Sequence, residues 1–200
     1  YLMGSLKKLD IYNKLNIFLV SDHGMTDVSP ERLIILDDFL TRMDDIYVNN
    51  SLSHVQIDVK KEKKRYRTKL REELAGLPHC KFWKKDEIPD RFHFQNRNTG
   101  EYLLLADEGW VFTSKSSLDE APFHLGGMHG YDPELKSMHG IFYAIGANIK
   151  EGIKIPAFEN IHIYPLLCKL LDISPYEGRE DAPQGDINIL DKILIKDIIK

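Results

Sequence analysis

Residues 16–21 read Asn-Ile-Phe-Leu-Val-Ser, a short apolar run that leads directly into Asp22, His23 and Gly24. A continuous apolar run of this length is typical of a strand buried on both faces, as in a parallel sheet covered by helices. The glycine permits a tight turn at the end of the strand. Open α/β sheets hold their ligands beyond the carboxyl ends of such strands, so this segment predicts both the fold class and the place of a site.

Strands and helices alternate outward from this run, which predicts an α/β fold. Ser29 and Pro30 resemble the N-terminus of a helix, with proline at its first position. Residues 101–106 and 110–113 resemble the two strands of a hairpin. From hydrophobic periodicity we further expect helices at 1–14, 61–76 and 161–172, strands at 46–49, 53–59, 81–84 and 140–146, and a surface loop at 178–184.

The length of 200 residues predicts about one domain, because domains commonly hold ~150 residues. Strand, helix and strand at 53–84 form a βαβ-like unit. We therefore expect residues 1–200 to belong to one domain, with an excursion from the main sheet at 46–100.

Composition excludes several classes of protein. The 27 Lys and Arg residues against 31 Asp and Glu residues give a net charge of −4, so no global basic field favours nucleic acid or an anionic membrane. The apolar runs are far shorter than the ~18 residues of a membrane span. Cys80 and Cys168 are too few for a disulfide framework, although a single bridge between them is compatible with the sequence.

Two clusters carry residues that ligate metals. Asp22 offers a hard oxygen and His23 an imidazole, a combination that suits Zn²⁺. His129 lies in a glycine-rich loop before the second buried strand, and His124 and His139 lie nearby. Structural roles also fit these residues, since Asp22 resembles a turn cap and the histidines resemble surface residues that cap turns.

The basic run at residues 60–71 resembles a nucleic-acid-binding segment, but Tyr66, Leu70 and Leu74 form an apolar stripe through it. Such a stripe is typical of a solvated helix with one packed face. Trp83 and Trp110 fit the core or a pocket wall better than a stacking platform.

Three motifs in this order resemble the nucleotide pyrophosphatase/phosphodiesterase family of the alkaline phosphatase superfamily. They are SDHGMTD at 21–27, ADEGW at 106–110 and MHGYDPELKSMHGIFYAIG at 128–146. The similarity runs to about Ser174. It implies an alkaline-phosphatase-like sheet flanked by helices, present here as an incomplete C-terminal portion of the catalytic domain.

The resemblance implies a site with two zinc ions. Asp22 and His23 match the ligands of the zinc that activates the nucleophile, and His129 matches a ligand of the other zinc. The Thr or Ser nucleophile and the remaining ligands are expected upstream of this chain, in the missing N-terminal half. Thr26 does not correspond to the nucleophile and is interpreted as a turn residue. No catalytic residue is therefore assigned here, and we expect the chain alone to be inactive.

The expected activity is zinc-dependent hydrolysis of phosphodiester or pyrophosphate bonds. Nucleotides are the substrates that we expect. The sequence leaves open other superfamily activities, on choline phospholipids, phosphomonoesters, phosphonates or sulfate esters, and a non-catalytic relative. No nucleic acid duplex is expected as a partner. The family implies an extracytoplasmic location, periplasmic or secreted.

Overall fold

A computed structural model of the chain describes residues 1–176 and 185–196, so the surface loop predicted at 178–184 lies outside the described residues. The chain divides into two compact units. One comprises residues 1–22 with the described residues from 140 onward, and the other comprises residues 23–139.

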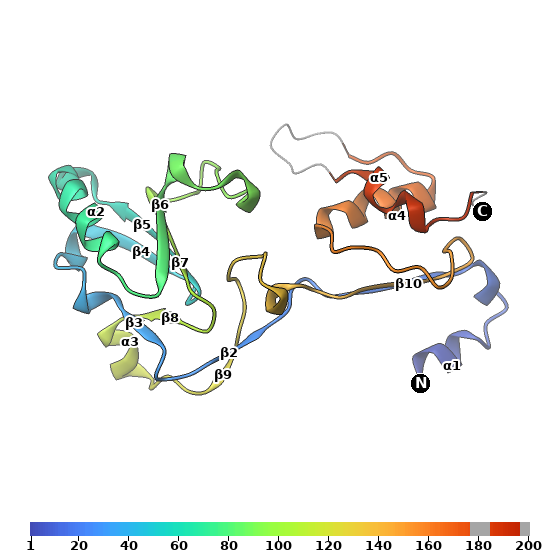
Figure 1. The fold of residues 1–200 in the computed structure, drawn as a ribbon, viewed down its shortest axis with the longest axis horizontal. Coiled ribbons are helices and arrows are strands. Elements are labelled where there is room, and N and C mark those ends of the chain that lie inside the picture. Colours follow the sequence, from blue (N-terminus) through green and yellow to red (C-terminus); the bar gives the residue numbers. More distant parts are fainter. Residues whose placement is uncertain (177–184, 197–200) are drawn as a thin grey trace. The chain divides into compact units, whose positions relative to one another are not determined.

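The unit of residues 23–139 contains a four-stranded sheet in the order β4-β5-β7-β6 (Figure 1). Its strands are β4 (Ile46–Asn50), β5 (His54–Val59), β6 (Cys80–Lys84) and β7 (Tyr102–Ala106). Both β5 and β6 pair with β7 in antiparallel register, so β5 and β6 run parallel to one another on either side of it. The predicted strand–helix–strand unit is present, with β7 inserted between its two strands.

Helix α2 (Arg67–Ala75) connects β5 to β6 and follows a 3-10 helix at Lys61–Tyr66. The predicted helix at 61–76 is therefore confirmed, with a kink at Lys63. Tyr66, Leu70 and Leu74 are buried in the same core cluster as the inner side chains of the sheet. The apolar stripe through the basic run thus packs against the sheet, as the sequence indicated.

Two further strand pairs complete this unit. Strand β2 (Thr26–Val28) pairs antiparallel with β9 (Gly126–Met128), and β3 (Leu33–Ile35) pairs parallel with β8 (Val111–Thr113). The hairpin predicted at 101–113 is wrong, because β7 and β8 take different partners. The predicted helix start at Ser29 and Pro30 is also wrong, since the chain there turns directly into β3. The short helices of this unit lie at Leu36–Asp38, Met43–Asp45, Lys85–Glu87, Asp90–Phe92, α3 (Lys115–Glu120) and Lys136–Met138.

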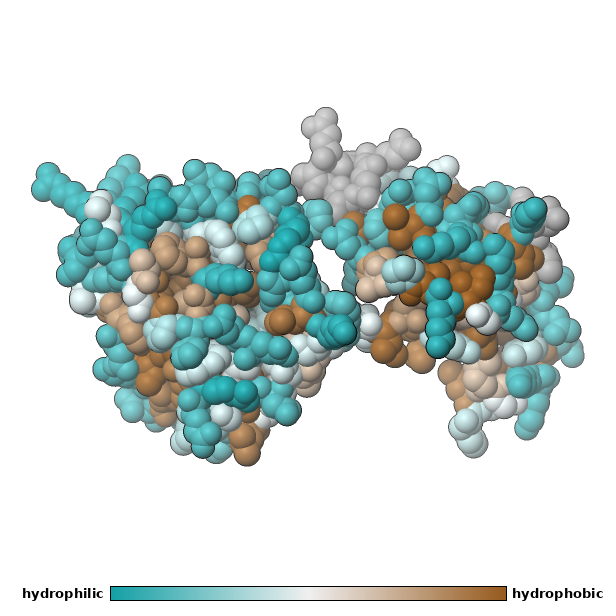
Figure 2. All heavy atoms as spheres, in the orientation of Figure 1, coloured by the Kyte–Doolittle hydropathy of each residue, from teal (hydrophilic) through white to brown (hydrophobic). Residues whose placement is uncertain are grey.

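The other unit contains β1 (Asn16–Val20) and β10 (Phe142–Gly146), which pair antiparallel with Asn16 opposite Gly146. Both strands were predicted, but within the described residues β1 pairs in antiparallel register, where a parallel neighbour was expected. Its faces are partly exposed, as expected for an incomplete portion of the domain. Leu19 is 57% exposed and Tyr143 is 60% exposed. Figure 2 shows apolar side chains at the surface of this unit.

Helices α4 (Ile163–Leu171) and α5 (Ile187–Leu190) pack in this unit around a small core that contains Leu166, Leu190 and Leu194. Helix α4 confirms the amphipathic helix predicted at 161–172. The helix predicted at 1–14 is present only as α1 (Leu2–Leu6) and a 3-10 helix at Tyr12–Lys14. Neither buries a residue, so no tertiary packing supports a longer helix.

The chain thus has a mixed α/β fold made of small sheets and short helices. Cys80 and Cys168 are both free thiols. Short helices near the C-terminal end lie at Asn160–His162 and Asp191–Ile193. No helix within residues 1–176 and 185–196 combines the length and apolar character needed to cross a bilayer.

Leu104 lies on the central strand β7 and is fully buried. Leu104→Ala should lower the free energy of unfolding by about 2–5 kcal/mol, because the cavity adds to the lost transfer free energy. Chemical denaturation measures this difference. Leu125→Ala is the matched control, since Leu125 is 78% exposed and its change should stay within about 0.5 kcal/mol. Equal effects of the two substitutions would contradict this assignment of the core.

Candidate functional site

His23 and His129 are in direct contact although more than a hundred residues separate them in the sequence. Their ring centroids are 3.6 Å apart and their planes differ by 13°, so the imidazoles stack face to face. The pairing of β2 with β9, in which Thr26 lies opposite Met128, brings the segments that carry the two histidines close together. The two histidines predicted as metal ligands are therefore brought together within one unit.

The orientation of the His23 ring is fixed by its own neighbour. Nδ1 of this half-buried histidine lies 2.7 Å from the carbonyl oxygen of Gly24. A carbonyl can only accept a hydrogen bond, so Nδ1 carries the hydrogen and Nε2 carries the lone pair of the neutral ring. Hydrogen bonding of one ring nitrogen to a carbonyl is the usual way in which a metal-binding histidine is oriented.

Gly24 is held against the segment that precedes β10. Its N–H donates to the carbonyl of Met138 at 2.9 Å. A Cβ atom at this position would lie 2.0 Å from the carbonyl oxygen of Ser137 and 2.8 Å from that of His139. Only glycine allows the two backbones to come this close, so the residue after His23 is fixed by sterics.

The residues after His129 anchor the segment that carries it. Gly130 has φ +86°, and a Cβ atom there would lie 2.7 Å from Oγ of Ser53. Tyr131 is buried and its hydroxyl donates to the carbonyl of Trp110 at 2.9 Å. These contacts hold the backbone on the unit while the His129 side chain stays exposed at the end of β9.

Asp132 completes the anchor through an ion pair with Arg91. Nη1 and Nη2 of the guanidinium donate to the two carboxylate oxygens at 2.7 and 2.5 Å. The hydrogen bonds from Arg91 hold the pKa of Asp132 below its usual value, against the opposing effect of burial. The bidentate geometry fixes the far end of the His129 segment.

Arg91→Gln should lower the free energy of unfolding by about 1 kcal/mol at neutral pH, because the pair is partly exposed. Asp132 has a lowered pKa in the folded state, so its contribution is present above its unfolded pKa of ~3.9 and is lost as the pH falls through the folded value. The difference between variant and wild type should therefore shrink as the solution is acidified below about pH 4. Denaturant titrations over pH 3 to 7 would show this. A difference that does not change with pH would contradict the role of the ion pair.

The other residues singled out in the sequence are Asp22, His124, His139 and Thr26. Asp22 is exposed and lies between β1 and His23, as the last residue of the first unit. His124 and His139 are exposed loop residues. Thr26 begins strand β2, so its interpretation as a turn residue is wrong, and it is half-buried opposite Met128.

Asp22, His23 and His129 are the candidate metal ligands of this chain. One carboxylate and two imidazoles are ligands that zinc accepts in proteins. Within residues 1–176 and 185–196, no group of three His, Cys, Asp or Glu side chains is arranged to hold an ion. The donor chemistry of Asp22, His23 and His129 suits zinc, but the described residues alone do not form a complete metal site.

The structural roles of Gly24, Ser53 and Arg91 were missed by sequence reasoning. Each acts through a contact with a distant segment, so no local pattern signals it. Trp110 packs against the core, as expected, and stacks on His79 with centroids 3.5 Å apart. Trp83 is half-buried and contacts the ring of Phe92 at 5.6 Å between centroids.

Known proteins resemble this chain over most of its length. Residues 1–132 match the family described as type I phosphodiesterase / nucleotide pyrophosphatase. Human ectonucleotide pyrophosphatase/phosphodiesterase family member 5 is 38% identical over 182 residues, which cover 89% of this chain and 36% of that protein. A bis(5'-adenosyl)-triphosphatase of Xenopus laevis is 34% identical over 176 residues, covering 87% of this chain and 37% of that protein.

Solved structures agree with the sequence matches. Human ectonucleotide pyrophosphatase/phosphodiesterase 5 superimposes with a TM-score of 0.83 at 34% identity, covering 97% of this chain and 49% of that structure. An inactive variant of the murine protein in complex with AMP gives a TM-score of 0.82 at 31% identity, with 98% and 49% coverage. The chain thus spans between a third and a half of the relatives it matches. By its family match and by its fold, the chain belongs to the type I phosphodiesterase / nucleotide pyrophosphatase family.

Proposed function

We propose that this chain contributes metal ligands to an enzyme that hydrolyses phosphodiester or pyrophosphate bonds in nucleotides. The observation that carries the proposal is the stacked pair His23 and His129, formed by segments far apart in the sequence. Membership of the family supports the reaction class. Among the relatives, one is named for cleaving a bis(5'-adenosyl) triphosphate and another was solved with AMP, which supports a nucleotide substrate.

Zinc is the metal that we propose, with two ions in the complete site. Asp22 and His23 would hold one ion, and His129 would hold the other. Bound zinc would supply Lewis acidity, which lowers the pKa of a hydroxyl nucleophile and neutralises charge on the phosphoryl oxygens. The carbonyl of Gly24 lies 2.7 Å from Nδ1 of His23, so Nε2 is the ring nitrogen that would bind an ion.

The nucleophile is proposed to be a Thr or Ser hydroxyl outside this chain. The aligned part covers about a third of the full-length relatives, which leaves ample sequence for it and for the remaining ligands. Thr26 is the alternative inside the chain. We do not favour Thr26 as the nucleophile, because its backbone pairs with Met128 between strands β2 and β9.

Three substrates test the proposal on protein expressed from its complete gene. The nitrophenyl ester of thymidine monophosphate and diadenosine triphosphate should be cleaved, and nitrophenyl phosphate much more slowly. Dialysis against a chelator should abolish the activity and zinc should restore it. Preferential cleavage of the monoester would contradict the diesterase assignment, and full activity after verified metal removal would contradict the zinc site.

The 200-residue chain produced alone should bind zinc weakly and cleave none of these substrates. Two zinc ions need about four ligands each, and the three proposed ligands are divided between them. Equilibrium dialysis with zinc and assay of the nitrophenyl diester check this expectation. Tight binding together with diester cleavage would place the nucleophile inside the chain and would bring Thr26 back into consideration.

We further propose an extracytoplasmic location, periplasmic or secreted. The names of the human and murine relatives describe them as ectonucleotide pyrophosphatases, which supports this assignment. Fractionation of cells, with the diesterase assay on each fraction, tests it. Activity confined to the cytoplasmic fraction would contradict it.

A further inference from the structure

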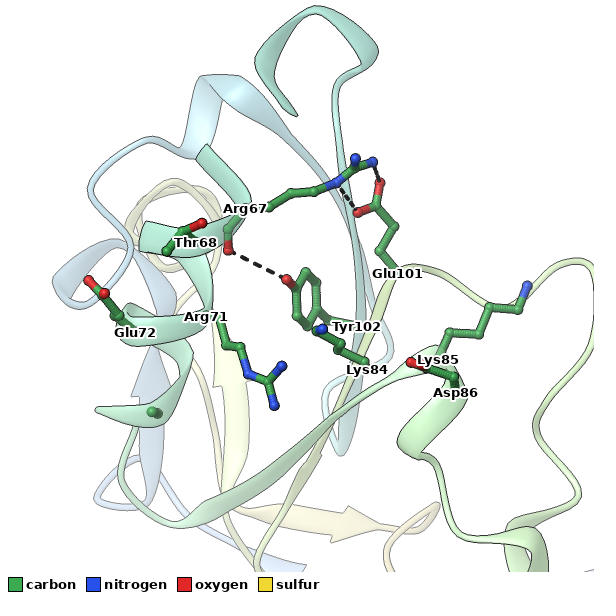
Figure 3. Close-up of a pocket in the computed structure, with 10 residues that line it drawn as sticks. Arg67, Thr68, Arg71, Glu72, Lys84, Lys85, Asp86, Glu101 and Tyr102 are labelled. Carbon is green, nitrogen blue, oxygen red and sulfur yellow. Dashed lines mark hydrogen bonds and ion pairs between the residues drawn. The ribbon is translucent and has the colours of Figure 1, made fainter. Parts of the chain in front are cut away.

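A second candidate site lies on the unit of residues 23–139, away from the elements that carry His23 and His129. It is an open pocket of about 780 Å³ between helix α2 and the end of strand β6 (Figure 3). Arg67, Thr68 and Arg71 line its helix side, and Lys84 and Lys85 line its strand side. This volume falls within the usual range for sites that hold small molecules, ~300–1,000 Å³.

The position of the pocket follows from how α2 packs. Leu70 and Leu74 face the sheet and are buried. Arg67 and Arg71, one helical turn apart, therefore lie along the neighbouring side of the helix. On the opposite side, β6 ends at Lys84, whose N–H donates to the carboxylate of Glu87 at 3.3 Å. Ordered secondary structure thus positions cations on both sides of the pocket.

Nearby carboxylates neutralise the basic side chains of the pocket to different degrees. Arg67 forms a bidentate ion pair, in which its Nε and Nη2 donate to Glu101 at 2.7 and 2.6 Å. Arg71 reaches the Glu87 carboxylate through Nη2 alone, at 3.1 and 3.4 Å. The ammonium of Lys84 forms no ion pair with any residue that the structure describes. Arg71 and Lys84 therefore keep donors available.

These two side chains point toward the same space. Figure 3 shows the Arg71 guanidinium and the Lys84 ammonium converging beside the ring of Tyr102. The buried Tyr102 hydroxyl is directed to the carbonyl of Arg67 at 3.5 Å. The Glu87 carboxylate offsets part of the Arg71 charge. An anion placed between the Arg71 guanidinium and the Lys84 ammonium would be attracted by both.

We propose that this pocket binds a phosphate group, either free or carried by a small molecule, between Arg71 and Lys84. A guanidinium offers paired donors to phosphate oxygens and a lysine adds a point charge. Thr68 also lines the helix side of the pocket. The aliphatic parts of the basic side chains and Ala75 give the carrier an apolar surface.

The acidic residues around the pocket favour a small ligand over a long polyanion. Glu72 and Asp86 lie at its margin, on the helix side and the strand side respectively. A chain with many phosphate or sulfate groups would bring some of them close to these carboxylates, which costs like-charge repulsion. One phosphate group between Arg71 and Lys84 avoids this cost.

Binding of inorganic phosphate and of glycerol phosphate, measured by titration calorimetry, tests the proposal. The protein is first treated with a chelator, so that phosphate held by metal at the His23–His129 site does not contribute. Arg71→Gln and Lys84→Gln should each weaken binding at least about tenfold, the loss expected for a charge-assisted hydrogen bond. Tighter binding of glycerol phosphate than of free phosphate would identify a carried phosphate, and the reverse would identify the free anion.

Two further variants make the test specific. Glu87→Gln should tighten phosphate binding several-fold, because Arg71 loses its competing carboxylate while the amide oxygen can still accept from the Lys84 N–H. Lys61→Gln is the matched control, an exposed lysine before α2 that does not line the pocket, and it should change binding less than twofold. No saturable binding by the wild type, or equal losses in Lys61→Gln and Lys84→Gln, would overturn the proposal. Neither result would bear on the diesterase assignment, which is measured with metal present.

Discussion

His129→Ala should remove zinc from one of the two proposed sites and lower diesterase turnover by more than about a hundredfold. Loss of a residue that merely orients a metal ligand costs ~10–100-fold, so loss of the ligand itself should cost more. The fold should survive, because the His129 side chain is exposed at the end of β9 and such substitutions usually change stability by less than about 0.5 kcal/mol. Turnover, metal content and thermal unfolding are measured on the same preparation.

Asp22→Asn should act in the same direction, since the neutral amide is a poorer zinc ligand than the carboxylate. His124→Ala is the control: His124 is also an exposed histidine of the same unit, and its loss should leave zinc content and turnover near those of the wild type. Wild-type turnover with full metal content in His129→Ala would show that this residue is not a ligand. Equal losses in His124→Ala and His129→Ala would point to a general effect on the loop.

Local patterns in the sequence predicted individual elements well. Strand β5 (His54–Val59) alternates between buried and half-buried or exposed residues, the period that a half-buried strand requires. Helix α2 is signalled by its apolar stripe in the same way. Such periodicities depend only on neighbouring residues, so they can be recognised before the partner of the element is known.

Pairing between strands was predicted less well, because it depends on distant segments. The apolar run at 16–20 does form strand β1, but its partner is β10 in antiparallel register, more than a hundred residues later. Strand β8 lies close to β7 in the sequence yet pairs with β3. Apolar content at 16–20 and 111–113 indicates burial in some sheet, and it does not specify which neighbour supplies the hydrogen bonds.

In the candidate site, too, residues with a local signal were predicted and residues that act through distant contacts were not. Asp22, His23 and His129 were selected from residue chemistry and from the family resemblance, and the structure brings the two histidines into contact. The residues that hold them carry no such signal. Arg91 reaches Asp132 across more than forty residues, and its guanidinium could equally have remained in solvent as far as the sequence shows.

Gly24→Ala should disrupt the site strongly, although it adds only one methyl group. The new Cβ would lie 2.0 Å from the carbonyl oxygen of Ser137, and a backbone atom cannot swing aside as a flexible side chain does. The two segments must separate, which strains the 2.9 Å hydrogen bond from Gly24 N–H to Met138. His23 is the preceding residue and bonds to the Gly24 carbonyl, so its ring should shift with the backbone. A misplacement of ~1 Å at a catalytic site can cost ~100-fold in rate.

The loss in Gly24→Ala should appear mainly in turnover, with a moderate destabilisation of about 1–3 kcal/mol from overpacking. Gly126→Ala provides the comparison, because Gly126 belongs to β9 in the same unit and a Cβ there meets no atom within 4 Å. Both variants make the same chemical change, so any difference between them reports the close approach at Gly24. Turnover of the nitrophenyl diester and denaturant midpoints are compared side by side. Equal behaviour of the two variants would show that the segment at Ser137 yields without moving His23, and the steric account of Gly24 would then have to be abandoned.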